Sequence, residues 1–198
     1  MRDTPQAAYA TDGSDFRGAV KHRYGIAVRR FLAFFPAFLV MWVQLFVWQI
    51  DSLLPLAILG FIGGIWTLML FWGRMGRVRR CSRVLRTYPL ALRAPVERVG
   101  EEGSLTVFLR LGAQDGGSST MRAQDTVGSK RRPVDVTSGL WFAGDDPFGG
   151  AAIVPGSGEL LFLQPKDWAV RAGERSNAGE ERLCAARRAG ITRPARFR

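Results

Sequence analysis

The residue types that could do chemistry are densest in residues 141–150, which read WFAGDDPFGG. Asp145 and Asp146 form an adjacent carboxylate pair, and the glycines of the segment suggest a phosphate-binding loop. Neighbouring residues of a strand or turn point in different directions, so adjacent carboxylates do not by themselves form an acid/base pair. Carboxylates also repel phosphate unless a metal intervenes. The segment therefore predicts no catalytic, cofactor or metal site.

A structural turn accounts for the same residues. The Asp-Asp-Pro sequence is typical of the start of a turn, and Gly149 and Gly150 allow positive backbone φ angles after it. Trp141 and Phe148 are then expected to enter a core. If Trp141 alternates with Phe142 on a strand, one ring enters the core and the other lies on the opposite face or under a closing helix. We choose Trp141 for the core.

The other reactive residue types are isolated in the sequence. His22 is the sole histidine, so any Ser-His or Cys-His pair would depend on it, and no Gly-x-Ser-x-Gly or His-Glu-x-x-His string occurs. Residues 128–132, GSKRR, lack the first glycine of a Walker phosphate loop. Cys81 and Cys184 have no motif spacing, so we expect free thiols rather than a disulfide or zinc site. An enzyme is not expected.

Two apolar runs dominate the first half of the chain. Residues 31–50 and 53–72 contain no charged side chain and are separated only by Asp51 and Ser52. A helix of about 20 residues spans about 30 Å, the thickness of the hydrocarbon core of a bilayer. A cleaved signal peptide is the competing interpretation, but the long polar lead and the missing small-residue cleavage site argue against it. The runs predict a transmembrane helical hairpin.

The net charge of +11 is confined to the flanks of this hairpin. Residues 17–30 hold five basic residues and residues 73–86 hold six, without an acid in either window, and the remaining 17 basic residues equal the 17 acids in number. Positive flanks stay on the cytoplasmic side, so both termini are expected in the cytoplasm of a bacterial cell, with the hairpin in the inner membrane. The flanks should contact anionic head groups. Nucleic acid is not an expected partner, because the rest of the chain has no charge surplus.

The second apolar run carries small residues on one helical face, at Ala57, Gly60 and Gly64. Such a face allows two helix backbones to approach closely. The sequence leaves two interpretations open: packing within the hairpin, against Ala33 and Ala37, or formation of a homodimer through the second helix.

After the hairpin the apolar period changes from 3.6 to 2, and clusters of Gly, Pro and Asp separate short apolar runs. This pattern predicts a small antiparallel β-rich domain of six or seven strands. The basic segment before Pro89 is expected to continue the second helix. The predicted strands cover about residues 90–99, 105–111, 119–126, 134–136, 140–143, 151–154 and 160–163.

A closing helix is expected from Asn177, as N-cap with Glu180 three residues on, to Gly190. The predicted organisation is thus an α+β membrane protein in four parts. These are a disordered tail (1–16), the hairpin with its flanks (17–86), a cytoplasmic β-domain with its closing helix (87–190) and a basic tail (191–198).

The basic hairpin, the Trp141 to Asp145 and Phe148 to Gly150 strings and the later Gln164-Pro165 pair together resemble uncharacterised actinobacterial integral membrane proteins. The 25 arginines against three lysines fit a GC-rich genome. The order of two helices, about seven strands and a closing helix also resembles bacterial membrane proteins with pleckstrin-homology-like domains. The first resemblance carries no known activity. We expect an interaction or regulatory module with a protein partner; the alternative is a membrane-tethered sensor of lipid or a small ligand.

Overall fold

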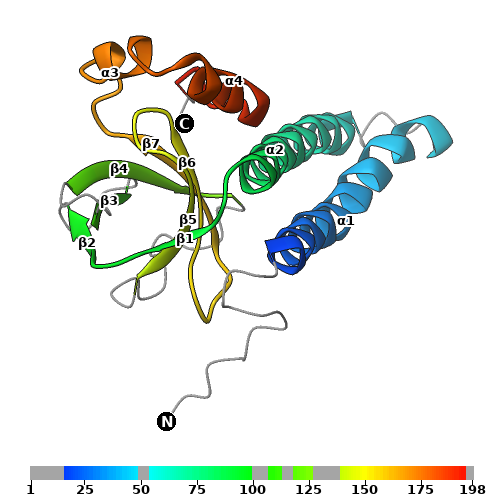
Figure 1. Ribbon diagram of the computed structural model, residues 1–198. Helices are drawn as coiled ribbons and strands as arrows, with labels where there is room; N and C mark the ends of the chain where they lie inside the picture. Colours follow the sequence, from blue (N-terminus) through cyan, green and yellow to red (C-terminus); the bar gives the residue numbers. More distant parts are fainter. Residues whose placement is uncertain (1–15, 49–53, 100–106, 113–117, 127–138, 195–198) are drawn as a thin grey trace.

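Two long helices pack side by side as a hairpin at one end of the molecule (Figure 1). The structure is a computed structural model, and it describes residues 16–48, 54–99, 107–112, 118–126 and 139–194. α1 covers Phe16–Trp48 and α2 covers Leu54–Thr87, so both basic flanks are helical and continuous with the apolar runs. α2 ends just before Pro89, which confirms that the second helix continues through its basic flank.

The apolar side chains of the hairpin contact each other along one face and are exposed on the others. The rings of Phe31 and Phe71 lie 4.5 Å apart, and those of Trp42 and Phe61 lie 6.1 Å apart. Only 6% and 11% of the most apolar windows of α1 and α2 are buried. The hairpin is therefore not the buried core of a soluble domain, and both helices are long and apolar enough to cross a membrane.

Among the described residues seven antiparallel strands follow, and they form one curled sheet in the order β1-β5-β6-β7-β4-β3-β2. β1 and β2 lie at opposite edges of this order although only Ala94 and Pro95 separate them. Such a short connection requires the two edges to approach each other. The Gly112 N–H of β3 donates to the Pro95 carbonyl at 3.0 Å, which continues the β2–β3 pairing into this connection. The strands are β1 (Ala91–Arg93), β2 (Val96–Val99), β3 (Val107–Gly112), β4 (Ser118–Asp125), β5 (Leu140–Asp145), β6 (Gly149–Ile153) and β7 (Leu160–Pro165).

The antiparallel sheet and the number of strands agree with the prediction, but two details differ. The single strand expected over residues 90–99 is two strands, because Pro95 interrupts the ladder and has no N–H to donate. The strand expected over residues 134–136 lies outside the described residues.

Two apolar clusters stabilise the sheet, one on each face. The inner face of the curl is filled by fully buried side chains such as Leu109, Met121 and Phe142. The outer face of β6 and β7 packs against α2, through Cys81 and neighbouring residues, and against the C-terminal helices. β6 and β7 are buried along their whole length because both of their faces are covered.

The structure corrects the prediction that Trp141, rather than Phe142, enters the core of the sheet. Phe142 is 2% exposed and lies inside the curl, whereas Trp141 is half-buried and packs on the outer, helix-facing cluster. The alternation of the two rings across β5 was predicted correctly. Which face is the inner one depends on how β5 pairs with β1 and β6, and the local pattern does not contain that information.

The chain closes with two helices, α3 (Ala172–Ser176) and α4 (Glu180–Ala189). α4 ends at Gly190 with a positive φ of 73°, as expected for a glycine C-cap. Its N-cap is Gly179 rather than Asn177, which instead caps the C-terminus of the short α3. The sequence pattern did not predict α3.

Candidate functional site at the basic neck

The two carboxylates of the β5–β6 turn are held apart by different arginines. Asp145 accepts two hydrogen bonds from Arg182 of α4, at 2.9 and 2.5 Å, and Asp146 forms an ion pair with Arg93 of β1 at 3.9 Å. Burial and the nearby charge of Asp145 raise the pKa of Tyr88 to about 12. The two ion pairs attach α4 and β1 to the turn, so Asp145 and Asp146 belong to separate ion pairs rather than to one acid/base pair.

The glycines of the same turn allow strands to approach closely. Gly149 has a φ of 88°, which favours glycine, and a Cβ on Gly150 would lie 2.8 Å from both the Gly144 Cα and the Phe142 ring. Phe148 is 2% exposed and belongs to the outer cluster. In the described structure, these residues are packed against protein atoms and form no open cradle for phosphate.

The small residues of α2 face α1. A Cβ on Gly60 would lie 2.7 Å from the backbone of Phe38 and Trp42, and Ala57 is 3% exposed. Gly64 is further away, with its nearest α1 atom at 4.0 Å. Gly63 approaches the Phe38 ring closely, a contact that the sequence analysis did not anticipate. The α1 residues nearest to these glycines are Phe38, Met41 and Trp42 rather than the predicted Ala33 and Ala37, and the glycines pack within the hairpin.

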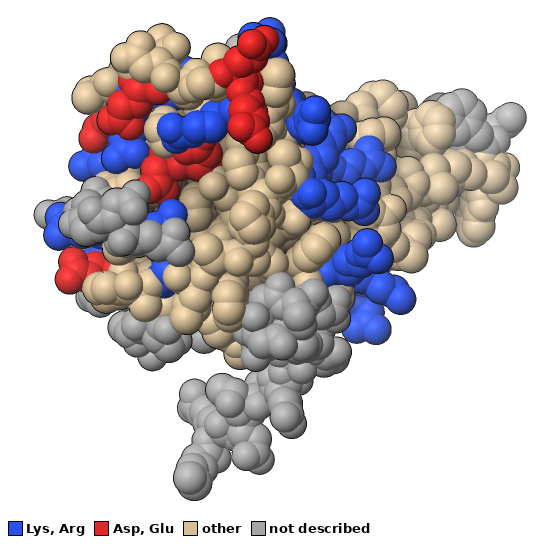
Figure 2. All heavy atoms as spheres, in the orientation of Figure 1, with Lys and Arg blue, Asp and Glu red and all other residues tan. Residues whose placement is uncertain are grey.

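The basic neck, which we define as residues 17–30 of α1 and 73–86 of α2, joins the apolar hairpin to the sheet. Figure 2 shows Lys and Arg side chains gathered there, while the described part of the hairpin beyond it shows neither blue nor red atoms in this view. The exposed basic residues of the neck are Arg17, Lys21, Arg29, Arg79, Arg80, Arg83 and Arg86.

A buried ion cluster links the neck to the sheet. The Arg23 side chain is only 6% exposed and lies 3.9 Å from Asp125 at the end of β4 and 3.9 Å from Glu159 before β7. Arg77 donates from Nε to the carbonyl of Thr126 at 3.3 Å. One arginine from each long helix therefore contacts the sheet where β4 ends and β7 begins, so the hairpin and the sheet form a connected unit.

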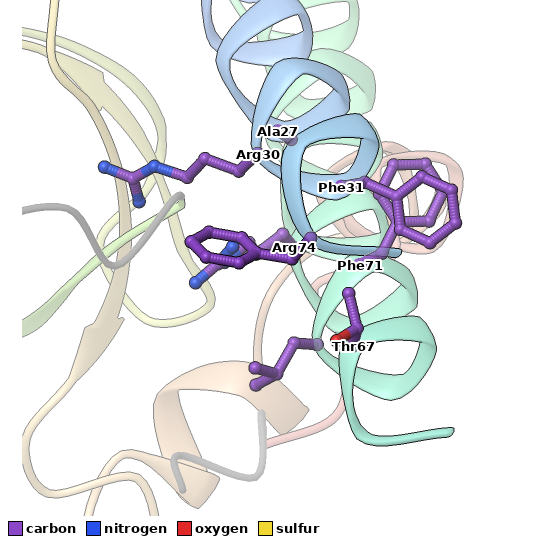
Figure 3. Close-up of a pocket in the computed structure, with 8 residues that line it drawn as sticks. Ala27, Arg30, Phe31, Thr67, Phe71 and Arg74 are labelled. Carbon is purple, nitrogen blue, oxygen red and sulfur yellow. The ribbon is translucent and has the colours of Figure 1, made fainter. Parts of the chain in front are cut away.

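A pocket of about 400 Å³ opens between α1 and α2 where the neck meets the apolar part of the hairpin. Its lining combines two arginines, Arg30 and Arg74, with aromatic and aliphatic side chains. In Figure 3 both arginines project to the same side, away from the paired rings of Phe31 and Phe71. The eight lining residues are Ala27, Arg30, Phe31, Phe34, Thr67, Leu70, Phe71 and Arg74.

The sequence analysis counted Arg30 and Arg74 only as part of the charge windows. A signal for their proximity was present, since Arg30 directly precedes the first apolar run and Arg74 lies two residues after the second. In an antiparallel hairpin these positions fall at the same level. What the sequence could not show is that both side chains line one pocket.

Among the described residues no group of three or more His, Cys, Asp or Glu side chains is placed to hold a metal ion. Comparison of the chain with protein-family models, curated proteins and solved structures finds no match. The resemblances suggested by the sequence therefore stay predictions.

Proposed function

We propose that this is an integral protein of a bacterial inner membrane, in which the hairpin spans the bilayer and holds the curled sheet at the cytoplasmic surface as an interaction or regulatory module. The observation that supports this most is the change from apolar to basic surface at the neck. Exposed apolar side chains such as Leu32 and Met69, at 61% and 62%, lie on one side of it, and the exposed arginines lie on the other. Apolar surface of this extent is stable in lipid, and basic residues flank its cytoplasmic side.

The packed interior of the sheet favours a module that acts through its surface. A sensor with a pocket inside the sheet would need space there, but fully buried side chains such as Leu111, Leu140 and Leu163 fill the curl. The buried Arg23 cluster also holds the sheet in a fixed orientation to the hairpin. The module would thus present a defined outer surface to a protein partner.

The cytoplasmic location can be tested with the protein's own cysteines. Cys184 on α4 is exposed and Cys81 is buried, so a maleimide should label Cys184 first. In intact spheroplasts a membrane-impermeant maleimide is expected to leave the protein unlabelled, and permeabilisation should expose Cys184. The Cys184→Ser variant is the control for labelling of Cys81. Labelling in intact spheroplasts would place the sheet on the outside and contradict the proposal.

The module role can be tested by affinity capture from detergent. The full-length protein is compared with a version that ends at Thr87 and so keeps both long helices but lacks the sheet. We expect at least one protein to be captured by the full-length chain alone. If both versions capture the same proteins, the sheet is not the interaction module.

A further inference from the structure

We propose that the pocket between α1 and α2 binds the phosphate head group of a single anionic phospholipid. This inference rests on the proposed insertion of the hairpin in a membrane, and it adds a specific ligand site. Diffuse attraction of the neck to a charged surface would use its exposed arginines. Arg30 and Arg74 are instead half-buried and line one pocket of about 400 Å³.

The charge of the pocket suits a phosphate. Its eight lining residues include two arginines and no acid. Each guanidinium can donate two parallel hydrogen bonds to phosphate oxygens, so two of them can hold one phosphate by several charge-assisted bonds. Asp125, the acid of the neighbouring ion cluster, pairs with Arg23, and its charge also acts on Arg74. The Thr67 hydroxyl donates to the Gly63 carbonyl at 2.8 Å, so the charged donors of the lining are the two arginines.

The rest of the lining indicates a lipid rather than free phosphate. Phe34 and Leu70 are 60% and 42% exposed, and they continue the pocket wall onto the apolar surface of the hairpin. An acyl chain attached to the bound phosphate would cover this surface, whereas inorganic phosphate would leave it uncovered. The pocket also lies where the apolar runs end, which is the level of lipid phosphates if the hairpin spans a bilayer.

Native mass spectrometry of the full-length protein in detergent can count bound lipids. We expect one phosphatidylglycerol to remain bound more tightly than further copies and at least about tenfold more tightly than phosphatidylcholine, whose choline cation opposes the arginines. The Arg30→Gln/Arg74→Gln variant should lose this preference by about tenfold or more. The matched control, Arg29→Gln/Arg79→Gln, removes the same charge from exposed positions of the neck outside the pocket lining and should keep it.

A second variant tests the pocket without changing any charge. Leu70→Trp places a larger side chain on the partly exposed wall and should also release the lipid. Equal loss of lipid in the pocket variant and its control would overturn the proposal in favour of diffuse charge attraction. Displacement of the lipid by millimolar inorganic phosphate would overturn the choice of a lipid ligand. Failure of membrane insertion is a separate result, since the wild-type protein would then purify without detergent.

Discussion

Replacing Phe142 with alanine is expected to unfold the curled sheet or leave it near its melting point under physiological conditions. The ring is 2% exposed inside the curl and lies close to Gly144 of the same strand and Gly150 of β6. Loss of a buried phenylalanine side chain removes its apolar burial and leaves a cavity, which together cost about 3–5 kcal/mol. Domains of this size are stable by about 5–15 kcal/mol, so the change is a large fraction of the total.

The Cys81 thiol provides a measurement of this unfolding. Cys81 is fully buried between α2 and the sheet, so in a Cys184→Ser background a thiol-reactive dye reports opening of the outer cluster as the temperature rises. Trp141→Ala is the matched control, because Trp141 is the neighbouring ring on the half-buried face, and it should lower the melting temperature by clearly less. Equal melting temperatures for Phe142→Ala and wild type would show that the inner core is not formed as described.

Trp141 and Phe142 also show which features of the fold can be predicted from the sequence. Period-two alternation places Trp141 and Phe142 on opposite faces of a strand, and the structure has them there. It does not say which face curls inward. The inward face of β5 is decided by the pairing of β5 with β1 and β6 and by the helices α2 and α4, which cover the outer face. These are contacts between segments that are distant in the sequence.

The hairpin was predictable for a different reason. Its signal is composition sustained over 20 residues, which needs no tertiary information, and the basic residues before Pro89 carry no helix-breaking residue apart from glycine. The corrections at β1, β2 and α3 concern elements of three to five residues. At that length one proline or one cap decides the structure, and period counts have too few residues to be informative.

The candidate site, like the fold, was only partly predictable from the sequence. The charge windows were visible in the sequence, but the pairing of Arg30 with Arg74 in one pocket depends on the rotation of α1 against α2. That rotation is set by close contacts such as Gly60 with the backbone of Phe38 and Trp42. The ion cluster of Arg23 was not anticipated, because its acids come from the ends of strands far along the chain.

The Arg23→Met variant is expected to separate the neck from the sheet and to destabilise the protein by about 3–5 kcal/mol. Arg23 lies between Asp125 and Glu159, whose side chains are 15% and 9% exposed. Both contacts are 3.9 Å long, so the arginine contributes mainly by its charge rather than by short hydrogen bonds. Without it the two largely buried carboxylates would lose the cation that lies within 4 Å of both, while Asp125 would keep the charges of Arg74 and Arg77 near it.

The same argument predicts that the loss can be reversed by removing the acids. The triple variant Arg23→Met/Asp125→Asn/Glu159→Gln also removes the two carboxylate charges that Arg23 contacts, so dye labelling of Cys81 should show recovery of most of the wild-type melting temperature. Arg17→Met removes an exposed arginine from the same helix and should change the melting temperature little. If Arg23→Met melts like Arg17→Met, the cluster does not hold the sheet to the hairpin. If the triple variant is less stable than Arg23→Met, the carboxylates stabilise the neck by contacts other than the one with Arg23.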